Sequence, residues 1–598
     1  MCGIYGIISK ENTKSDLLKK MEMVQIHRGP DGEGHFIDDS VAMGMRRLSI
    51  IDVDNGGQPF FSEDKKIVVL CNGEIYNFKE LREELILLGY QFNTESDIEV
   101  LPYLYKEFGI NFVAKLNGMY AISLWDVEEN TFYLIRDRMG VKPLYYSNIK
   151  EGFFYASEMK SIINTGYVQK DLDFEALSSF LEITYIPTPR TAFKSIKKLD
   201  SASYLKLNSG KFEIINYWDP KVNVNHKMTE EDCLKEIDEI LKDSIDHQLI
   251  SDVPLGAFLS GGVDSSLITA LSAQKSKEKF SSFHMRWNDI KGKTDESKFA
   301  NKVIEKYDLK NFTKNVSEID IPSLLAKLIW HLDEPFGDAA FVPTYVLAEH
   351  AAKNVKVILS GAGGDELFGG YTRYKNYSKI KSIIGKVLYN KSPAFSYYDI
   401  NKGAYTRLWK NAFKWYKPGS AKSKFDDLFK ENKKEDKLNA YMLGDLKFYL
   451  QDNILAFTDK MTSAASIECR VPLLDHRIVE LSLKTPSKLK IKGQEYKYIL
   501  KKYSENHLDK DILYREKEGF GSPVWSWIDK YRFSHFNSLL EEGTLLEEMK
   551  IDNRFLIKLI NKKKLDYGEY WMYWHLLVLE IWTQIYIKDI PFQKVFND

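Results

Sequence analysis

A cysteine at position 2, followed by Gly3-Ile4-Tyr5-Gly6-Ile7, is well placed for nucleophilic chemistry. An initiator methionine is readily removed when the next side chain is small, and Cys2 would then carry both a thiol and a free α-amine. That amine has a pKa near ~8, so much of it can be neutral and can accept the proton of the thiol. The alternative is an N-terminal strand with a buried cysteine. Cys2 therefore predicts a nucleophile that supplies its own base.

Four polar motifs follow Cys2 within the first hundred residues. They are His27-Arg28-Gly29-Pro30-Asp31-Gly32, Arg46-Arg47-Leu48-Ser49-Ile50-Ile51-Asp52, Asn72-Gly73-Glu74-Ile75-Tyr76-Asn77 and Glu95-Ser96-Asp97. A motif such as RGPDG or NGE, taken alone, would indicate a turn. In this order after Cys2, the motifs closely resemble those of the class II glutamine amidotransferases, which are N-terminal-nucleophile enzymes. The resemblance implies a glutaminase domain over residues 2–210, folded as an αββα sandwich.

The resemblance also implies a role for each polar residue of these motifs. Cys2 would attack the carboxamide of glutamine, and Asn72 with the backbone N–H of Gly73 would stabilise the oxyanion that forms. Arg47 would hold the carboxylate of glutamine. Glu74 and Asp97 would bind its α-amino group, since a zwitterion needs a fixed cation and one or two carboxylates.

A second motif, Leu259-Ser260-Gly261-Gly262-Val263-Asp264-Ser265-Ser266, connects a predicted strand to a predicted helix. Loop amides and a helix N-terminus in this arrangement face an anion. No Gly-Lys-Ser/Thr follows, so this is not a Walker A loop. It resembles the PP-loop of ATP pyrophosphatases, which grips the β,γ-phosphates as a leaving group, although a lone motif of this kind can be a plain strand–helix turn.

Three further motifs extend the resemblance to most of the chain. They are His331-Leu332-Asp333-Glu334-Pro335-Phe336, the run from Ser360 to Tyr371 (SGAGGDELFGGY), and Glu468-Cys469-Arg470-Val471-Pro472-Leu473-Leu474-Asp475. With the first half, they resemble the glutamine-hydrolysing asparagine synthetase family from Cys2 to about Ile585. Other class II amidotransferases carry a sugar-isomerase or phosphoribosyltransferase half, and no motif of either is present. The resemblance implies a synthetase domain over residues 225–590, a doubly wound α/β PP-loop fold with a helical C-terminal part.

The resemblance implies ATP and Mg²⁺ as cofactors of this second domain. Asp264 and Asp365 would ligate Mg²⁺ on the pyrophosphate, because paired carboxylates with phosphate oxygens suit that ion. Lys497 would neutralise charge on the α-phosphate, whereas without the family context it reads as a solvated lysine. The residues expected to line the ATP site are Leu259, Ser260, Gly261, Gly262, Asp264, Ser265, Met285, Ser360 and Gly361.

One departure from the family pattern affects the choice of acceptor. The family normally carries Asp or Glu between Gly361 and Gly363, and here the residue is Ala362. We expect conversion of aspartate to asparagine through a β-aspartyl-AMP intermediate, with ammonia channelled from glutamine. The alternatives are the same chemistry on another carboxylate, such as a sugar acid or a cell-wall peptide, and a catalytically lapsed binding subunit.

Composition limits the remaining classes of function. With 598 residues the chain is too long for one core, which predicts two large domains. The 84 basic and 85 acidic residues give a net charge of −1, so neither a nucleic-acid partner nor a membrane surface is expected. The four cysteines lack metal spacing, and residues 1–9 do not resemble a signal peptide, which predicts a cytoplasmic protein. A homodimer remains open as the assembly.

Hydrophobic periodicity indicates the elements that must position these residues. Strands are expected at 66–71, 131–136, 253–259 and 355–360, and helices at 78–90, 229–249, 265–274 and 570–582. Residues 200–230 are interpreted as a turn-rich link between the domains, and residues 375–440 as peripheral helices and loops. Strands that alternate with helices after residue 250 predict the doubly wound sheet.

Overall fold

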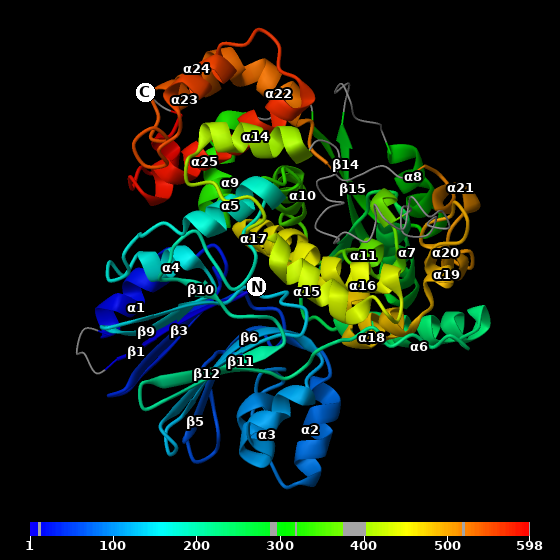
Figure 1. Cartoon of the computed structure of the whole chain (residues 1–598). Helices are drawn as coiled ribbons and strands as arrows, with labels where there is room; N and C mark the ends of the chain where they lie inside the picture. The colour runs from blue at the N-terminus through cyan, green and yellow to red at the C-terminus, as the bar shows by residue number, and fades with distance from the viewer. Residues whose placement is uncertain (10–13, 288–295, 317–319, 375–401, 517–520, 597–598) are drawn as a thin grey trace.

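The computed structural model describes the chain except residues 10–13, 288–295, 317–319, 375–401, 517–520 and 597–598 (Figure 1). Of the segment expected to form peripheral helices and loops, 375–401 lies outside the described residues. The remainder is helical, with α14 (Lys402–Ala412), α15 (Lys422–Asn432) and α16 (Lys437–Gly444). Among the described helices, none has both the length and the apolar character needed to cross a membrane.

The first half contains two stacked antiparallel sheets between two layers of helices, which confirms the predicted αββα sandwich (Figure 1). The first sheet has the order β10-β8-β9-β1-β3-β2, formed by Lys197–Lys198, Tyr145–Ile149, Gly152–Ala156, Gly3–Ile8, Val41–Arg47 and Gly32–Ile37. The second has the order β12-β11-β7-β6-β5-β4, formed by Lys211–Asn216, Ser203–Asn208, Thr131–Arg136, Gly118–Asp126, Ile67–Ile75 and Phe60–Phe61. Helices α1 (Lys14–Met23) and α4 (Met159–Ile163) cover the first sheet, and α2 (Phe78–Leu87) and α3 (Val100–Phe108) cover the second.

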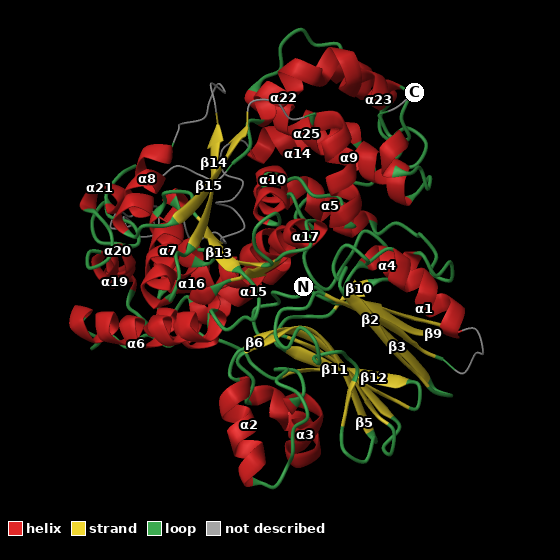
Figure 2. Cartoon of the chain, turned by 180° about the vertical axis from the view of Figure 1, so that it is seen from behind, coloured by secondary structure: helices red, strands yellow, loops and turns green. Residues whose placement is uncertain are grey.

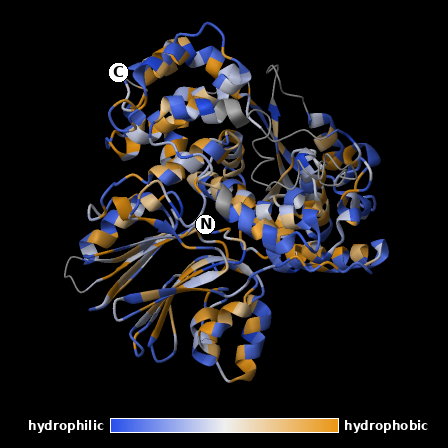
Figure 3. Ribbon diagram, in the orientation of Figure 1, coloured by the Kyte–Doolittle hydropathy of each residue, from blue (hydrophilic) through white to orange (hydrophobic). Residues whose placement is uncertain are grey.

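Strand β5 shows why this half forms two layers of core. Val68 and Leu70 pack between the sheets, while Val69 and Cys71 pack beneath α2 and α3. Alternate side chains of a strand point to opposite faces, so a strand that is covered on both faces is apolar throughout. Figure 3 shows this as hydrophobic colour along the strands of both sheets.

The prediction of a turn-rich link over 200–230 is wrong for its first part. Strands β11 and β12 form a hairpin across Ser209-Gly210, and β11 pairs with β7 along its whole length. Leu205 and Leu207 point into the core between the sheets, as alternation in a half-buried strand requires. The sandwich therefore extends to Asn216, and the boundary expected at residue 210 falls inside this hairpin.

The second half is built on a five-stranded parallel sheet in the order β15-β14-β13-β16-β17, which confirms the predicted doubly wound fold. These strands are Lys310–Val316, Ser281–Trp287, Leu255–Phe258, Val357–Leu359 and Glu468–Arg470. Helices α7 (Val263–Lys275) and α8 (Ser297–Lys306) lie on one face, and α10 (Phe341–Ala351) and α17 (Ala456–Ala464) lie on the other (Figure 2). Such a sheet binds ligands at the carboxyl ends of its strands.

Helices complete the second half. Helix α6 (Glu230–Gln248) begins at a capping box of Thr229 and Asp232, as its sequence predicts. Helix α25 (Tyr567–Tyr586) is buried, which confirms the predicted C-terminal core helix. The other helices are α5 (Phe174–Ile183), α9 (Ile321–Leu332), α11 (Gly364–Phe368), α18 (His476–Lys484), α19 (Ser487–Lys490), α20 (Tyr498–Ser504), α21 (Lys510–Leu513), α22 (Val524–Tyr531), α23 (Asn537–Glu541) and α24 (Asn553–Ile560), with π-helical turns at Asp445–Leu455 and Arg532–Phe536.

Candidate active sites

Cys2 lies directly before β1, which is one of the two central strands of the first sheet. Its side chain is 8% exposed, and its backbone N–H donates to Asn72 Oδ1 at 3.1 Å. Arg28 Nε donates to the Cys2 carbonyl at 2.9 Å, which holds the start of the strand in place. Since Gly3 pairs with Arg46 in the neighbouring strand β3, the register also places Arg47 beside Cys2. The fold thus brings together three of the residues expected in the glutaminase site.

Asn72 and Gly73 occupy fixed positions at the centre of β5. Asn72 Nδ2 donates to Ser157 Oγ at 3.3 Å, and the same hydroxyl accepts from the N–H of Ile4 at 3.0 Å. A Cβ added at Gly73 would lie 2.0 Å from the Met119 carbonyl oxygen, so this position requires glycine. A rigid pair of donors is what an oxyanion hole needs. That role remains a prediction for both residues.

Arg47 holds the loop that follows β3. Its guanidinium donates to the carbonyls of Ile51, Asp52 and Val53 at 3.2, 2.7 and 3.0 Å. The guanidinium is therefore held against the loop 51–53. Its contact with the carboxylate of glutamine remains a prediction.

Glu74 and Asp97 form a buried acidic pair. Asp97 Oδ2 accepts from the N–H of Ile75 at 2.8 Å, which places it next to the Glu74 backbone. Burial raises the pKa of Asp97 to about 7, although the Ile75 N–H opposes the shift. Burial and then the charge of Glu468 raise the pKa of Glu74, while Arg470 opposes this rise. A cation bound here would be neutralised by two carboxyl groups in a site of low dielectric.

Met1 occupies the space next to these acids. Its side chain packs with Leu48, Ile50 and Val357, and its amine lies 3.9 Å from Glu468 Oε2. Burial lowers the pKa of this amine to about 6, so a terminal amine here is readily neutral. Burial also raises the pKa of the Cys2 thiol, so ionisation of the thiol needs a base. The Cys2 nitrogen can be that base after removal of Met1, which remains a prediction.

The second site lies at the carboxyl edge of the parallel sheet. The Ser260–Gly262 loop follows β13 and leads into α7, with Gly261 at φ +79°, a conformation that favours glycine. The hydroxyls of Ser260 and Ser265 lie 2.9 Å apart and fix this loop. A Cβ at Gly361 would lie 2.7 Å from the Asp264 carbonyl carbon, so the loop after β16 packs directly on the first one.

Lys497 joins the two carboxylates expected to bind Mg²⁺. Its Nζ lies 2.7 Å from Asp365 Oδ1 and is also ion-paired with Asp264 Oδ2. Burial disfavours the charged amine, but the ion pairs with Asp264 and Asp365 outweigh burial and raise the Lys497 pKa. In the described residues no group of three or more His, Cys, Asp or Glu side chains could hold a metal. Two convergent carboxylates still fit Mg²⁺, which commonly takes one or two of them with substrate phosphates and waters.

The other residues expected to contact ATP lie near this edge but not all on one side. Leu259 belongs to the apolar cluster on the α7 face of the sheet. Met285, on β14, belongs to the cluster on the α10 face. Ser360 and Gly361 follow β16 beside Asp264. The loop residues are therefore brought together with Asp264, whereas contact of Leu259 and Met285 with ATP remains a prediction.

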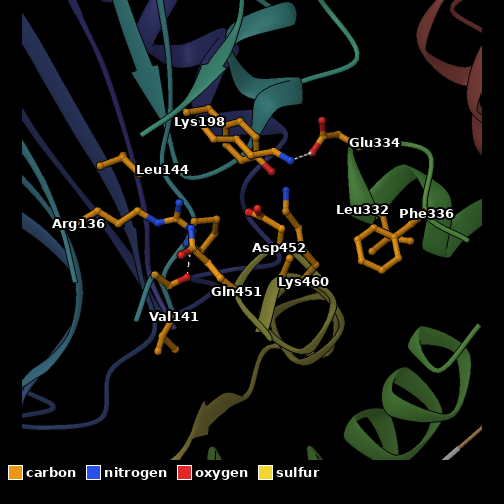
Figure 4. Close-up of a pocket in the computed structure, with 14 residues that line it drawn as sticks. Arg136, Val141, Leu144, Lys198, Leu332, Glu334, Phe336, Gln451, Asp452 and Lys460 are labelled. Carbon is orange, nitrogen blue, oxygen red and sulfur yellow. Dashed lines mark hydrogen bonds and ion pairs between the residues drawn. The ribbon is translucent and has the colours of Figure 1, made fainter. Parts of the chain in front are cut away.

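The HLDEPF motif lies at the contact between the two domains and not at the nucleotide site. Asp333 is ion-paired with Lys160 at 2.9 Å and with Lys460, and Glu334 is ion-paired with Lys198 at 2.7 Å. Figure 4 shows the ion pair of Glu334 and Lys198 in the lining of a small cavity between the two halves. Its volume of about 30 Å³ holds roughly one or two waters and no substrate.

An apolar cluster connects the two sites. It contains Met119 and Val141 from the first half and Leu359, Val471 and Leu474 from the second, with Ala362 packed against it. Met119, Val141, Val471 and Leu474 also line a cavity of about 20 Å³. Asp137, Arg138, Asp475 and His476 line the same cavity, so its lining is partly apolar and partly charged.

Sequence reasoning did not assign Arg28, Ser157, Glu468 or Arg470 to the glutaminase site. Arg28 and Ser157 contact the Cys2 segment and Asn72, as described above. Arg470 Nη2 lies 3.1 Å from Glu74 Oε2, and Arg470 Nε donates to Glu468 Oε1 at 3.0 Å. Arg28 stands in the RGPDG motif and the last two stand in the ECRVP motif. The motifs thus marked these positions, but the contacts of their side chains depend on tertiary structure.

Comparisons with known proteins agree with this arrangement. The sequence model of the family described as asparagine synthase matches residues 236–584, and that of the glutamine amidotransferase domain matches residues 1–218. Glutamine-hydrolyzing asparagine synthetase 1 from Bacillus subtilis (strain 168) is 33% identical, over 98% of this chain and 97% of its own length. Glutamine-hydrolyzing asparagine synthetase B from Escherichia coli (strain K12) is 29% identical, over 88% of this chain and 84% of its own. These matches cover both halves.

Proposed function

The chain belongs to the asparagine synthase family, and from that premise we propose that it hydrolyses glutamine at Cys2 and uses the ammonia to convert aspartate to asparagine. ATP would activate the aspartate carboxylate at the Ser/Gly loop, through a β-aspartyl-AMP intermediate. The observation that carries this proposal is the Lys497 bridge between Asp264 and Asp365 beside that loop. It is a cationic and acidic site suited to a nucleotide, in a different half of the chain from Cys2.

In the glutaminase half, the Cys2 thiol would attack the carboxamide carbon of glutamine. The Cys2 α-amine, freed by removal of Met1, would take the thiol proton and then help ammonia to leave. Asn72 and the Gly73 N–H would stabilise the oxyanion, and water would release glutamate from the thioester. Arg47, Glu74 and Asp97 would hold the two charged groups of glutamine, which fixes the carboxamide beside the thiol.

In the synthetase half, a carboxylate oxygen of aspartate would attack the α-phosphate of ATP, and pyrophosphate would leave. Asp264 and Asp365 would hold Mg²⁺, which supplies charge neutralisation for the leaving pyrophosphate. Lys497, freed from one of its carboxylates, would neutralise charge on the α-phosphate. Ammonia would then attack the acyl carbon, and AMP would leave.

Ammonia would travel between the sites along the apolar cluster that contains Met119, Val141 and Leu474. Support for this route comes from the position of the cluster, which begins beside Tyr76 and reaches Leu359 and Ala362. The apolar side chains of this cluster favour neutral NH₃ over ammonium, although Asp137, Arg138, Asp475 and His476 also line the cavity beside Met119 and Val141.

Product analysis tests the proposal. With glutamine, ATP, Mg²⁺ and aspartate, the expected products are glutamate, AMP, pyrophosphate and asparagine. AMP and pyrophosphate are expected because a loop without a Walker lysine is suited to grip the leaving pyrophosphate. Formation of ADP and phosphate instead would contradict the assignment of the second half.

A second candidate is the same reaction on a different carboxylate, and Ala362 is the observation that favours it. Ala362 lies between Ser360 and Asp365, half-buried, and its N–H donates to Ser360 Oγ at 3.3 Å. Its methyl group can neither accept a proton nor bind a cation. Glu366 is 1% exposed, and one of its carboxyl oxygens already accepts from the Tyr371 hydroxyl. An acceptor such as a sugar acid or a cell-wall peptide carboxylate would then be the natural substrate.

Replacement of Ala362 with glutamate distinguishes the two acceptors. If the acceptor is aspartate, Ala362→Glu should raise the turnover of aspartate, because general-base help is typically worth about 10²–10⁴-fold. The measurement is pyrophosphate release with saturating aspartate and ammonia, and Ala362→Gln serves as the control of equal size without the charge. A fast wild-type reaction that slows on gaining the carboxylate would refute this role for position 362.

A further inference from the structure

The ion pair between Arg470 and Glu74 joins the two halves of the chain at the glutaminase site. Both side chains are buried, with side-chain exposures of 1% and 8%, and the two charged groups are 3.1 Å apart. Glu74 lies on β5 of the sandwich, whereas Arg470 lies on β17 of the parallel sheet. A residue of the synthetase half therefore contacts a carboxyl group that is expected to bind glutamine.

The contacts of Arg470 fix its guanidinium from several directions. Nη1 donates to the carbonyls of Gln248, the last residue of α6, and of Ile250 at 2.8 and 2.7 Å. Nε donates to Glu468 Oε1 at 3.0 Å, which leaves Nη2 facing Glu74. A planar guanidinium held on two sides presents its third side in one orientation. The carboxyl of Glu74 therefore faces a rigidly held cation through an ion pair.

The charges around Glu74 make this contact important for its ionisation. Burial, Glu468 and Asp97 all favour the neutral acid, while Arg470 and the terminal amine favour the carboxylate. Tyr76 is close as well, with its ring 5.9 Å from the Arg470 guanidinium carbon, and Lys142 Nζ is 3.4 Å from Glu468 Oε2. Removal of Arg470 would leave the buried Glu74 without its cationic partner. Glu74 would then lie near two other acids, Glu468 and Asp97.

We propose that Arg470 is a positioning residue of the glutaminase site, which holds Glu74 as an oriented carboxylate for the α-ammonium group of glutamine. The inference rests on the proposed role of Glu74 in glutamine binding. Arg470 contacts Glu74, which is expected to bind the α-ammonium group and not the carboxamide, so its effect should fall on the binding of glutamine rather than on the chemical step. The glutaminase site is accordingly incomplete without the second half of the chain.

The same residue is connected to the nucleotide loop. The carbonyl of Arg470 accepts from the N–H of Ser360 at 2.9 Å, and Ser360 begins the loop that carries Asp365. A shift of this loop would move the backbone from which the Arg470 side chain extends. Glu74 thus has a short structural connection to the ATP site.

The test compares full-length Arg470→Met and Arg470→Lys with the wild type in steady-state glutamine hydrolysis. Once the pKa of Glu74 lies above the working pH, each further unit of pKa lowers its ionised fraction about tenfold. We therefore expect Arg470→Met to raise KM for glutamine by about tenfold or more at pH 7, with kcat nearly unchanged. The deficit should shrink as the pH rises from 7 to 9, because Glu74 then ionises. Arg470→Lys, which keeps the charge, should fall between the two.

Three controls make the outcome specific. Arg477 lies seven residues after Arg470 and pairs with Asp475 and Asp243. Arg477→Met should therefore leave KM for glutamine unchanged. Pyrophosphate release with ammonia as the nitrogen source should persist in Arg470→Met, which shows an intact synthetase half. Glu74→Gln combined with Arg470→Met should bind glutamine no more weakly than Glu74→Gln alone.

Different failures of this test have different meanings. An unchanged KM for glutamine in Arg470→Met would overturn the positioning role. Loss of both glutamine hydrolysis and the ammonia-dependent reaction in this variant would also overturn it. A wild-type chain that hydrolyses no glutamine would instead overturn the proposed function. A normal KM in Glu74→Gln would remove Glu74 from the glutamine site, and the inference with it.

Discussion

Replacement of Cys2 with alanine is expected to abolish glutamine hydrolysis and to leave amide synthesis from ammonia intact. The thiol is the expected nucleophile, and loss of a catalytic nucleophile typically lowers kcat by about 10⁴-fold or more. The ammonia-dependent reaction should persist because Asp264, Asp365 and Lys497 lie in the other half of the chain. The measurements are glutamate release from glutamine, and pyrophosphate release with glutamine or with ammonia.

Cys71→Ala is the matched control for this prediction. Cys71 is a fully buried thiol next to Asn72 in sequence, but it faces α2 and α3 rather than Cys2. It should retain glutaminase activity, apart from a modest cost in stability for the lost packing. The mass of the wild-type chain should also show that Met1 has been removed. Loss of both activities in Cys2→Ala would contradict two separate sites. Normal hydrolysis by this variant would contradict Cys2 as the nucleophile.

The sequence predicted the segments that carry the expected glutaminase residues, because their motifs lie on strands of the predicted sandwich. Cys2 precedes β1, Arg47 ends β3, and Asn72, Gly73 and Glu74 lie within β5. Pairing of β1 with β3 places Cys2 beside Arg47, and stacking of the two sheets brings Asn72 of β5 to Cys2. The boundaries were less predictable, because the hairpin of β11 and β12 was hidden by turn residues on both sides.

Contacts between the domains could not be predicted from the sequence. Periodicity reports which face of an element is buried but not which distant residue covers it. Arg28 illustrates this: it is fully buried and pairs with Glu158 and with Asp459 of α17. For the same reason the sequence does not predict Arg470 as part of the glutaminase site, although Arg470 lies in the ECRVP motif. Packing also decides which residues of a predicted strand face a ligand. The sequence alone therefore does not decide whether Met285 faces ATP.

Replacement of Lys497 with methionine is expected to remove ATP-dependent amide synthesis while sparing glutamine hydrolysis. Lys497 is 6% exposed and pairs with Asp264 and Asp365, so it is a buried cation held between the two carboxylates. A buried cation of this kind is ready to compensate charge that develops on the α-phosphate. Removal of one such preorganised group typically costs about 10²–10³-fold in kcat.

The loss should have a second, electrostatic component. Without Lys497, Asp264 and Asp365 would be two close carboxylates with no cation between them, and like charges at that distance disfavour double ionisation. Nucleotide binding should therefore become more dependent on Mg²⁺ concentration in Lys497→Met than in the wild type. Pyrophosphate release across a Mg²⁺ series, at saturating ATP and ammonia, measures this dependence.

Lys492→Met supplies the comparison for Lys497→Met. Lys492 lies five residues earlier with a side chain that is 59% exposed, and it pairs with Glu230 on the surface. Its replacement should change neither pyrophosphate release nor its dependence on Mg²⁺, since exposed ion pairs contribute little. Glutamate release should be normal in both variants because the Cys2 site is separate. A Lys497→Met enzyme that releases pyrophosphate at the wild-type rate would exclude Lys497 from adenylation and leave it as a counter-ion that only stabilises the fold.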